Sequence, residues 1–331
     1  MSRRRAIGTF LALGFLPLAV AAQQAVKIPT IGYITNDVAS IDRARREAFK
    51  QGLRDLGYVE GRSYRFEARI GEGNSAKLPA MMQDLLRTKP AVVFAFTTAA
   101  ILAARNAVRD GPLVMVAHTP VEIGLVDSLA RPSGNVTGLT LSSGTGIYGK
   151  YIELLTEILP GLRRIAVLYN QTNPVNSFMV TEALTVASGK GITLIPVSVN
   201  RPEDVKLVIN RSKKDGAEAL VVLPDALLLG QRRAIAEECI RVGLPSIGIS
   251  EQVEAGGLLA YSADRLEAMR RAASYVDKIL KGAKPSDLPI EQPTKFVLEV
   301  NLATAKALGL RVPQAALIRA DRVLESPPSS L

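Results

Sequence analysis

Polar side chains stand at the ends of several apolar runs of this sequence, where they could meet a small molecule. We single out Thr35, Asn36, Thr97, Thr98, His118, Thr119, Asn173, Asn176 and Asp225, together with Tyr261 in a later apolar run. Open α/β sheets bind ligands at the carboxyl ends of their strands, and the helices that follow offer free N–H groups there. The hydroxyl, amide and carboxylate groups of this set suit hydrogen bonding to a small ligand.

Each of these residues also has a purely structural interpretation. Asn36 can cap the helix that follows it, and Asn173, which precedes Pro174, is a good helix cap in its own right. Asp225 is equally compatible with a solvated loop, and Tyr261 with core packing. The sequence leaves these alternatives open.

Catalytic and metal-binding patterns are weak. His118 is the only histidine, and no second histidine, cysteine or carboxylate cluster accompanies it, so we expect no metal site. No G-x-S-x-G turn exists to present a serine nucleophile. Cys239, the only cysteine, lies on the apolar side of its helix and is expected to be buried. We therefore expect no catalytic residues.

One glycine-rich segment matches part of a dinucleotide-binding motif. Residues 144–149 fit G-x-G-x-x-G and precede an expected helix. A dinucleotide site would also need an acidic residue at the end of the next strand, and that strand ends at Tyr169 and Asn170. We expect no bound cofactor.

Strands and helices must alternate to position these loops. Short apolar runs predict strands at 27–35, 63–70, 91–96, 113–117, 165–169, 192–199, 219–224, 244–249, 256–262 and 295–300. Helices with one apolar face are predicted at 41–56, 76–87, 99–108, 148–159, 202–214, 231–242, 264–280 and 304–308. Regular alternation of this kind indicates an α/β fold with parallel sheets. The plan of strand, polar loop and helix at 27–56 returns at 163–199, which suggests two similar lobes facing one cleft.

The N-terminal 22 residues read as an export signal. Arg3, Arg4 and Arg5 precede the apolar run 6–22, and small residues precede Gln23. No lipid-anchor cysteine stands directly after this run, so we expect a periplasmic protein without a lipid anchor. The formal net charge is +10, but the basic residues are mixed with acids and the chain has no tryptophan, so we expect no nucleic-acid partner.

Three segments of the chain carry a family resemblance. The run LPIEQPTKFVLEVNLATAKALGLRVP (288–313), with SLARPSGNVTGLT (128–140) and EAGGLLAYS (254–262), resembles the ABC-transporter substrate-binding proteins that include tryptophan and tyrosine binders. The resemblance spans roughly residues 28 to 325.

This resemblance implies the type I periplasmic-binding-protein fold, which has two Rossmann-like lobes and a ligand cleft between them. Three crossovers would fall near 141–147, 250–257 and 285–294. The N-terminal lobe would comprise 27–141 plus 257–285, and the C-terminal lobe 147–250 plus 294–324. Residues 325–331, rich in proline and serine, would form a disordered tail.

The resemblance also implies a function. The protein would capture a small organic solute (amino acid, aromatic or carboxylate-bearing) by lobe closure, as a monomer, and deliver it to an ABC permease with its ATPase subunit. The family places ligand contacts in the loop that holds Thr97 and Thr98. Relatives usually carry Gly-Asp-Pro where this chain has His118-Thr119-Pro120. The missing acid would have paired with an ammonium group, so its loss favours a hydrogen-bonding or anionic ligand.

Two other functions compete with this one. An exported α/β hydrolase would use His118, although no nucleophile accompanies it. A periplasmic ligand sensor of the same fold would bind a solute without transporting it.

Overall fold

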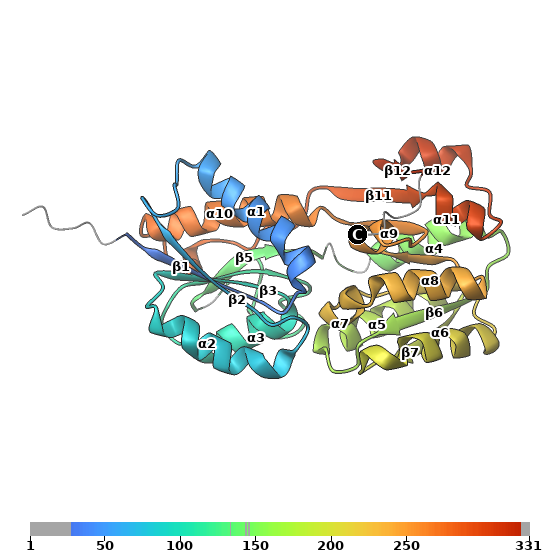
Figure 1. The fold of residues 1–331 in the computed structure, drawn as a ribbon, viewed down its shortest axis with the longest axis horizontal. Coiled ribbons are helices and arrows are strands. Elements are labelled where there is room, and N and C mark those ends of the chain that lie inside the picture. Colours follow the sequence, from blue (N-terminus) through green and yellow to red (C-terminus); the bar gives the residue numbers. More distant parts are fainter. Residues whose placement is uncertain (1–27, 133, 143, 145, 326–331) are drawn as a thin grey trace, which may run out of the picture.

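Apolar runs of three to six residues form the strands of two separate sheets (Figure 1). The computed structural model describes residues 28–132, 134–142, 144 and 146–325. The expected signal segment 1–22 and residues 326–331 of the expected tail lie outside the described residues. No helix of the described part has the length and apolar character needed to cross a bilayer.

The N-terminal lobe is built on a five-stranded parallel sheet in the order β2-β1-β3-β4-β5. The strands are β1 (Thr30–Thr35), β2 (Arg65–Ile70), β3 (Val92–Phe96), β4 (Leu113–Ala117) and β5 (Val136–Thr140). Two helices pack on each face, so β3 and β4 are buried throughout, as expected for parallel strands covered on both sides. One pair is α1 (Ala39–Asp55) with α10 (Arg265–Leu280), and the other is α2 (Leu78–Arg87) with α3 (Thr98–Ala107).

The C-terminal lobe holds a seven-stranded sheet in the order β12-β11-β10-β9-β8-β6-β7. Its pairs are parallel except that β11 runs antiparallel to β10, which departs from the predicted all-parallel pattern. The strands are β6 (Arg164–Tyr169), β7 (Thr193–Ser198), β8 (Ala219–Val222), β9 (Ser246–Gly248), β10 (Leu259–Ala263), β11 (Phe296–Asn301) and β12 (Arg322–Leu324).

Helices cover this second sheet on both faces as well. One face carries α4 (Gly146–Ile158), α5 (Pro174–Ser188), α11 (Leu302–Ala307) and α12 (Gln314–Arg319). The opposite face carries α6 (Val205–Lys214), α7 (Ala226–Gly230) and α8 (Arg232–Val242), where Cys239 is buried as predicted. The short α9 (Ser250–Glu254) follows β9. The sequence did not predict α7, α9, α12 or β12, because segments this short lack a measurable period.

The chain passes between the lobes three times. The first passage joins β5 to α4, and the third follows Glu291, whose backbone still bonds to Gly138 and Thr140 of β5. The expected second passage at 250–257 is wrong, because α9 and β10 both belong to the C-terminal lobe. The chain instead crosses between β10 and α10, at Ala263–Arg265. The N-terminal lobe therefore resumes at about 265 rather than 257.

Candidate ligand-binding site

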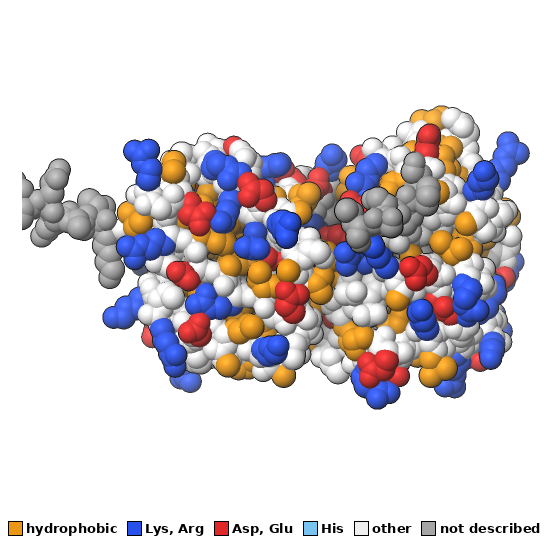
Figure 2. Space-filling view, viewed as in Figure 1, with side chains coloured by type: hydrophobic (Ala, Val, Ile, Leu, Met, Phe, Trp, Pro, Cys, Tyr) orange, Lys and Arg blue, Asp and Glu red, His pale blue; other side chains and the backbone are white. Residues whose placement is uncertain are grey.

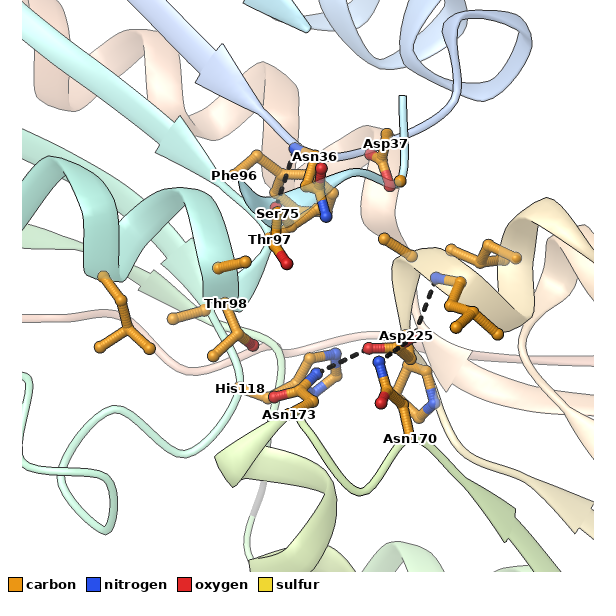
Figure 3. A pocket seen from close by; sticks show the side chains of 18 of the residues that line it. Asn36, Asp37, Ser75, Phe96, Thr97, Thr98, His118, Asn170, Asn173 and Asp225 are labelled. Carbon is orange, nitrogen blue, oxygen red and sulfur yellow. Dashed lines mark hydrogen bonds between the residues drawn. The ribbon is translucent and has the colours of Figure 1, made fainter. Parts of the chain in front are cut away.

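A cavity of about 310 Å³ lies between the two lobes, where the carboxyl ends of their strands face each other. Loops after β1, β3 and β4 line it from one lobe, and loops after β6 and β8 line it from the other. Six of the ten residues singled out from the sequence line this cavity, namely Asn36, Thr97, Thr98, His118, Asn173 and Asp225 (Figure 3).

The wall from the N-terminal lobe is built on the contact between two strand ends. The backbone N–H of Asn36 donates a hydrogen bond to Thr97 Oγ1 at 3.0 Å. Thr97 has φ 77°, a region that costs a β-branched residue energy, and it turns the chain from β3 into α3. Asn36 does not cap α1, whose N-cap is Val38, and its Oδ1 is buried without a partner among the described residues. This oxygen packs against Gly71, and the amide nitrogen of Asn36 is the atom that points toward the cavity (Figure 3).

His118 follows β4 and meets an arginine of α10. Its Nε2 lies 3.3 Å from Arg265 Nη2. A guanidinium only donates, so Nε2 accepts and the ring proton sits on Nδ1. Burial, and then the charges of Arg265 and Arg45, lower the pKa of His118 to about 3. The imidazole is therefore neutral at physiological pH. No group of His, Cys, Asp and Glu side chains in the described part is arranged to hold a metal ion.

The wall from the C-terminal lobe centres on Asp225. Its carboxylate accepts hydrogen bonds from Asn170 Nδ2 at 3.1 Å, Asn173 Nδ2 at 3.0 Å and the backbone N–H of Leu227 at 2.8 Å. Asn173 Oδ1 in turn accepts from the N–H of Val175 and caps α5. Asn173 and Asp225 are therefore helix caps that also face the cavity (Figure 3). For Asp225 this cap replaces the solvated loop that the sequence left open.

Two more candidates do not line the cavity, because their side chains make contacts inside the C-terminal lobe. Asn176 is fully buried, accepts from the N–H of Asn170 at 3.0 Å and donates to the carbonyl of Pro224 at 3.1 Å. Tyr261 stacks on Phe296, with ring centroids 5.5 Å apart, at the β10–β11 pair. Its role is strand packing rather than ligand contact.

The remaining two candidates lie just behind the cavity wall. Thr35 is buried and its Oγ1 accepts from the N–H of Asp37 at 3.2 Å, which shapes the loop that carries Asn36. Thr119 is buried with φ 45°, and its hydroxyl has no partner among the residues described. An acid at position 119 would be buried rather than presented to the ligand.

A group of buried charges that sequence reasoning missed surrounds the cavity. Arg45 of α1 forms ion pairs with Asp37 in its own lobe and with Glu251 of α9 in the other lobe. Arg45 also lies over the ring of Phe96, 4.8 Å from its centroid. Burial alone would raise the pKa of Glu251, but the charges of Arg45 and Arg265 outweigh it and bring that pKa to about 2. Three charged groups of this cluster, Asp37, Arg45 and Arg265, line the cavity.

One signal in the sequence could have revealed Arg45. It stands four residues after Ile41 and four before Phe49, on the face of α1 that is otherwise apolar. On the face of the molecule that Figure 2 shows, other Lys and Arg side chains are exposed, spread over both lobes and interspersed with Asp and Glu.

Comparisons with known proteins agree with this architecture. The family model described as ABC transporter substrate binding protein matches residues 34–324. The tyrosine-binding protein of Clostridioides difficile (strain R20291) is 27% identical over 278 residues, which is 82% of this chain and 78% of that protein.

Solved structures share the fold. A conserved domain protein from Vibrio cholerae superposes with a TM-score of 0.84 at 26% identity, covering 90% of this chain and 100% of that one. An ABC domain in complex with L-Trp from Streptococcus pneumonia has a TM-score of 0.83 at 23% identity, with the same coverage. The predicted two-lobed periplasmic-binding-protein fold is confirmed. Because the family match spans nearly the whole described chain, the protein belongs to the ABC transporter substrate-binding protein family.

Proposed function

We propose that this protein is an exported solute receptor of an ABC importer. It captures a small organic solute between its lobes in the periplasm and delivers it, as a monomer and without a cofactor, to a permease with its ATPase subunit. The observation that carries the proposal is the cavity of about 310 Å³ lined by both lobes. A solute there would contact both lobes at once in the closed form, and would therefore favour closure.

The size and lining of the cavity support a small solute. Small-molecule pockets usually measure about 300–1,000 Å³ and combine apolar walls with a few polar groups. Here Phe96, Leu102, Leu141, Leu227 and Leu229 supply apolar surface. Micromolar binding requires about 8 kcal/mol, more than a few hydrogen bonds supply, so enclosed apolar contact must provide most of it.

The relatives narrow the class of solute. One is a tyrosine-binding protein and another was solved with L-Trp. An aromatic or carboxylate-bearing solute is therefore the first class to test for this chain.

A thermal-shift screen of the protein from Gln23 onward tests the proposal. A ligand that binds only the folded state raises the melting temperature by mass action. We expect a shift with one chemical class among amino acids, aromatic acids, aliphatic carboxylates, nucleosides and sugars. No shift at millimolar concentration, together with turnover of ester or glycoside substrates, would replace the receptor by a hydrolase.

A further inference from the structure

Arg265 differs from Arg45 because it forms no ion pair with a carboxylate of the described residues, although the more distant charge of Glu251 acts on it. It is the first residue of α10, directly after the second passage between the lobes, and it lines the cavity at 7% exposure. No acid of the described residues lies within ion-pair distance of its guanidinium. Nη2 contacts His118, and Nη1 is buried without any hydrogen-bond partner in the described part of the chain.

The neighbouring charges are engaged with one another. Arg45 pairs with Asp37 and Glu251, and the oxygens of Asp225 accept from amide and backbone N–H groups. His118 is neutral and offers Arg265 only a lone pair. A buried guanidinium with a free N–H is costly unless an anion completes it. The cavity that it faces is the place from which that anion can come.

We propose that Arg265, oriented by His118, binds a carboxylate group of the solute. This inference rests on the proposed function and specifies the ligand class of that same site. The planar guanidinium fork matches a carboxylate with two parallel hydrogen bonds. His118 accepts from Nη2 and thereby fixes the plane of the fork.

A singly charged carboxylate fits better than a phosphate. One guanidinium is free, whereas Asp37 and Asp225 also line the cavity and Glu251 stands behind it. These acids would repel the second charge of a phosphate ester. At the wall away from His118, Asp37 lines the cavity and its Oδ1 has no hydrogen-bond partner in the described part of the chain (Figure 3). This acceptor favours a solute that carries a hydrogen-bond donor in addition to its carboxylate.

Pairs of acids and their isosteric primary amides test this proposal. The probes are 3-phenylpropionate, 3-(4-hydroxyphenyl)propionate, hexanoate and 4-hydroxyhexanoate, each with its amide, and phenyl phosphate as the dianion. Calorimetry on the whole protein from Gln23 should show at least one acid binding tenfold or more tightly than its amide. Arg265→Gln should weaken that acid at least tenfold and change its amide less than threefold.

Control variants separate recognition from folding. Arg270→Gln removes an exposed arginine of the same helix that pairs with Glu267, and should leave both affinities unchanged. Arg265→Lys keeps the charge but loses the fork, so the preference for the acid should shrink without vanishing; it also serves if Arg265→Gln fails to fold. If acid and amide weaken alike in Arg265→Gln, or if phenyl phosphate binds best, the carboxylate assignment is overturned. A thermal shift with uncharged sugars or nucleosides and none with acids would overturn it too, while leaving the receptor function intact.

Discussion

The protonation of His118 should make the stability of the protein depend on pH in a way that can be measured. Its pKa in the folded protein is about 3, chiefly through burial and then through Arg265 and Arg45, whereas an unfolded histidine titrates near 6.5. Below about pH 6.5 this histidine binds a proton in the unfolded chain, whereas in the folded protein it stays neutral until the pH approaches 3. Stability contributed by the neutral ring is therefore complete above pH 6.5 and is lost as the pH falls towards 3.

We expect His118→Gln to reduce this pH dependence. Between pH 7 and pH 5 the wild-type protein should lose about 2 kcal/mol more unfolding free energy than the variant does. Urea titrations of both proteins at the two pH values measure the difference. Equal losses would mean that His118 takes up a proton in the folded protein over the same pH range as in the unfolded chain.

Thr98 gives a test of the candidate site that is independent of folding. Its side chain lines the cavity and caps no helix, since the N-cap position of α3 is Thr97. We expect Thr98→Ala to weaken the solute found by thermal shift by about three- to tenfold, the value of one hydrogen bond, and to change the unfolding free energy by less than about 0.5 kcal/mol. Thr181→Ala, on the exposed face of α5, is the matched control. Unchanged affinity in Thr98→Ala would remove this hydroxyl from the site.

At the level of single residues, sequence reasoning found the polar loops but not the buried charges. Asn36 and Thr97 could be predicted because a strand end followed by a helix has a local signature. Arg265 could not, because its place depends on α10 crossing back to a sheet formed long before it in the chain. An arginine at the first turn of a helix normally faces solvent.

At the level of elements, local pattern gave the strands and helices well and their partners less well. The family resemblance implied a passage between lobes at 250–257, yet β10 pairs with β9 and β11 in the C-terminal sheet. Which sheet a strand joins depends on packing with distant strands, so it cannot be predicted from the strand's own apolar run.

The packing of α1 on α10 depends on a glycine. A Cβ at Gly52 would lie 2.3 Å from the carbonyl oxygen of Arg270 and 2.8 Å from Ala273 Cβ. Helix propensity alone predicts that Gly52→Ala stabilises by about 1 kcal/mol. The backbone clash is the larger effect, so we expect a net loss of about 1–3 kcal/mol.

Gly149 in α4 provides the matched control for that substitution. Its Cβ would meet Val186 at 3.8 Å, an ordinary contact, so Gly149→Ala should stabilise by about 0.5–1 kcal/mol. Denaturant unfolding of both variants gives the comparison. If both substitutions raised the unfolding free energy, a clash between α1 and α10 would not be the main effect of Gly52→Ala.

At the level of the whole molecule, the ion pair between Arg45 and Glu251 ties the lobes together in the closed arrangement. Arg45 belongs to α1 and Glu251 to α9, so opening the cleft would separate them. We expect Glu251→Gln to shift the balance towards the open form by about 1 kcal/mol, which lowers solute affinity about fivefold.

Glu254→Gln, three residues further along α9, is the control, because Glu254 pairs with Arg322 of its own lobe. Small-angle scattering should show a larger radius of gyration for unliganded Glu251→Gln than for Glu254→Gln. Identical scattering and affinity would show that the ion pair does not hold the lobes.

The late return of α10 to the N-terminal lobe also governs how the chain is made. Met269, Ala272, Ala273 and Val276 complete the apolar layer that covers β3, β4 and α1. During synthesis the first five strands leave the ribosome before α10, which covers one face of their sheet. Strands β6 to β10 of the second sheet are made in between. Until α10 is synthesised, this apolar surface of the first sheet stays uncovered, so the N-terminal lobe completes its core only after most of the C-terminal lobe has been made.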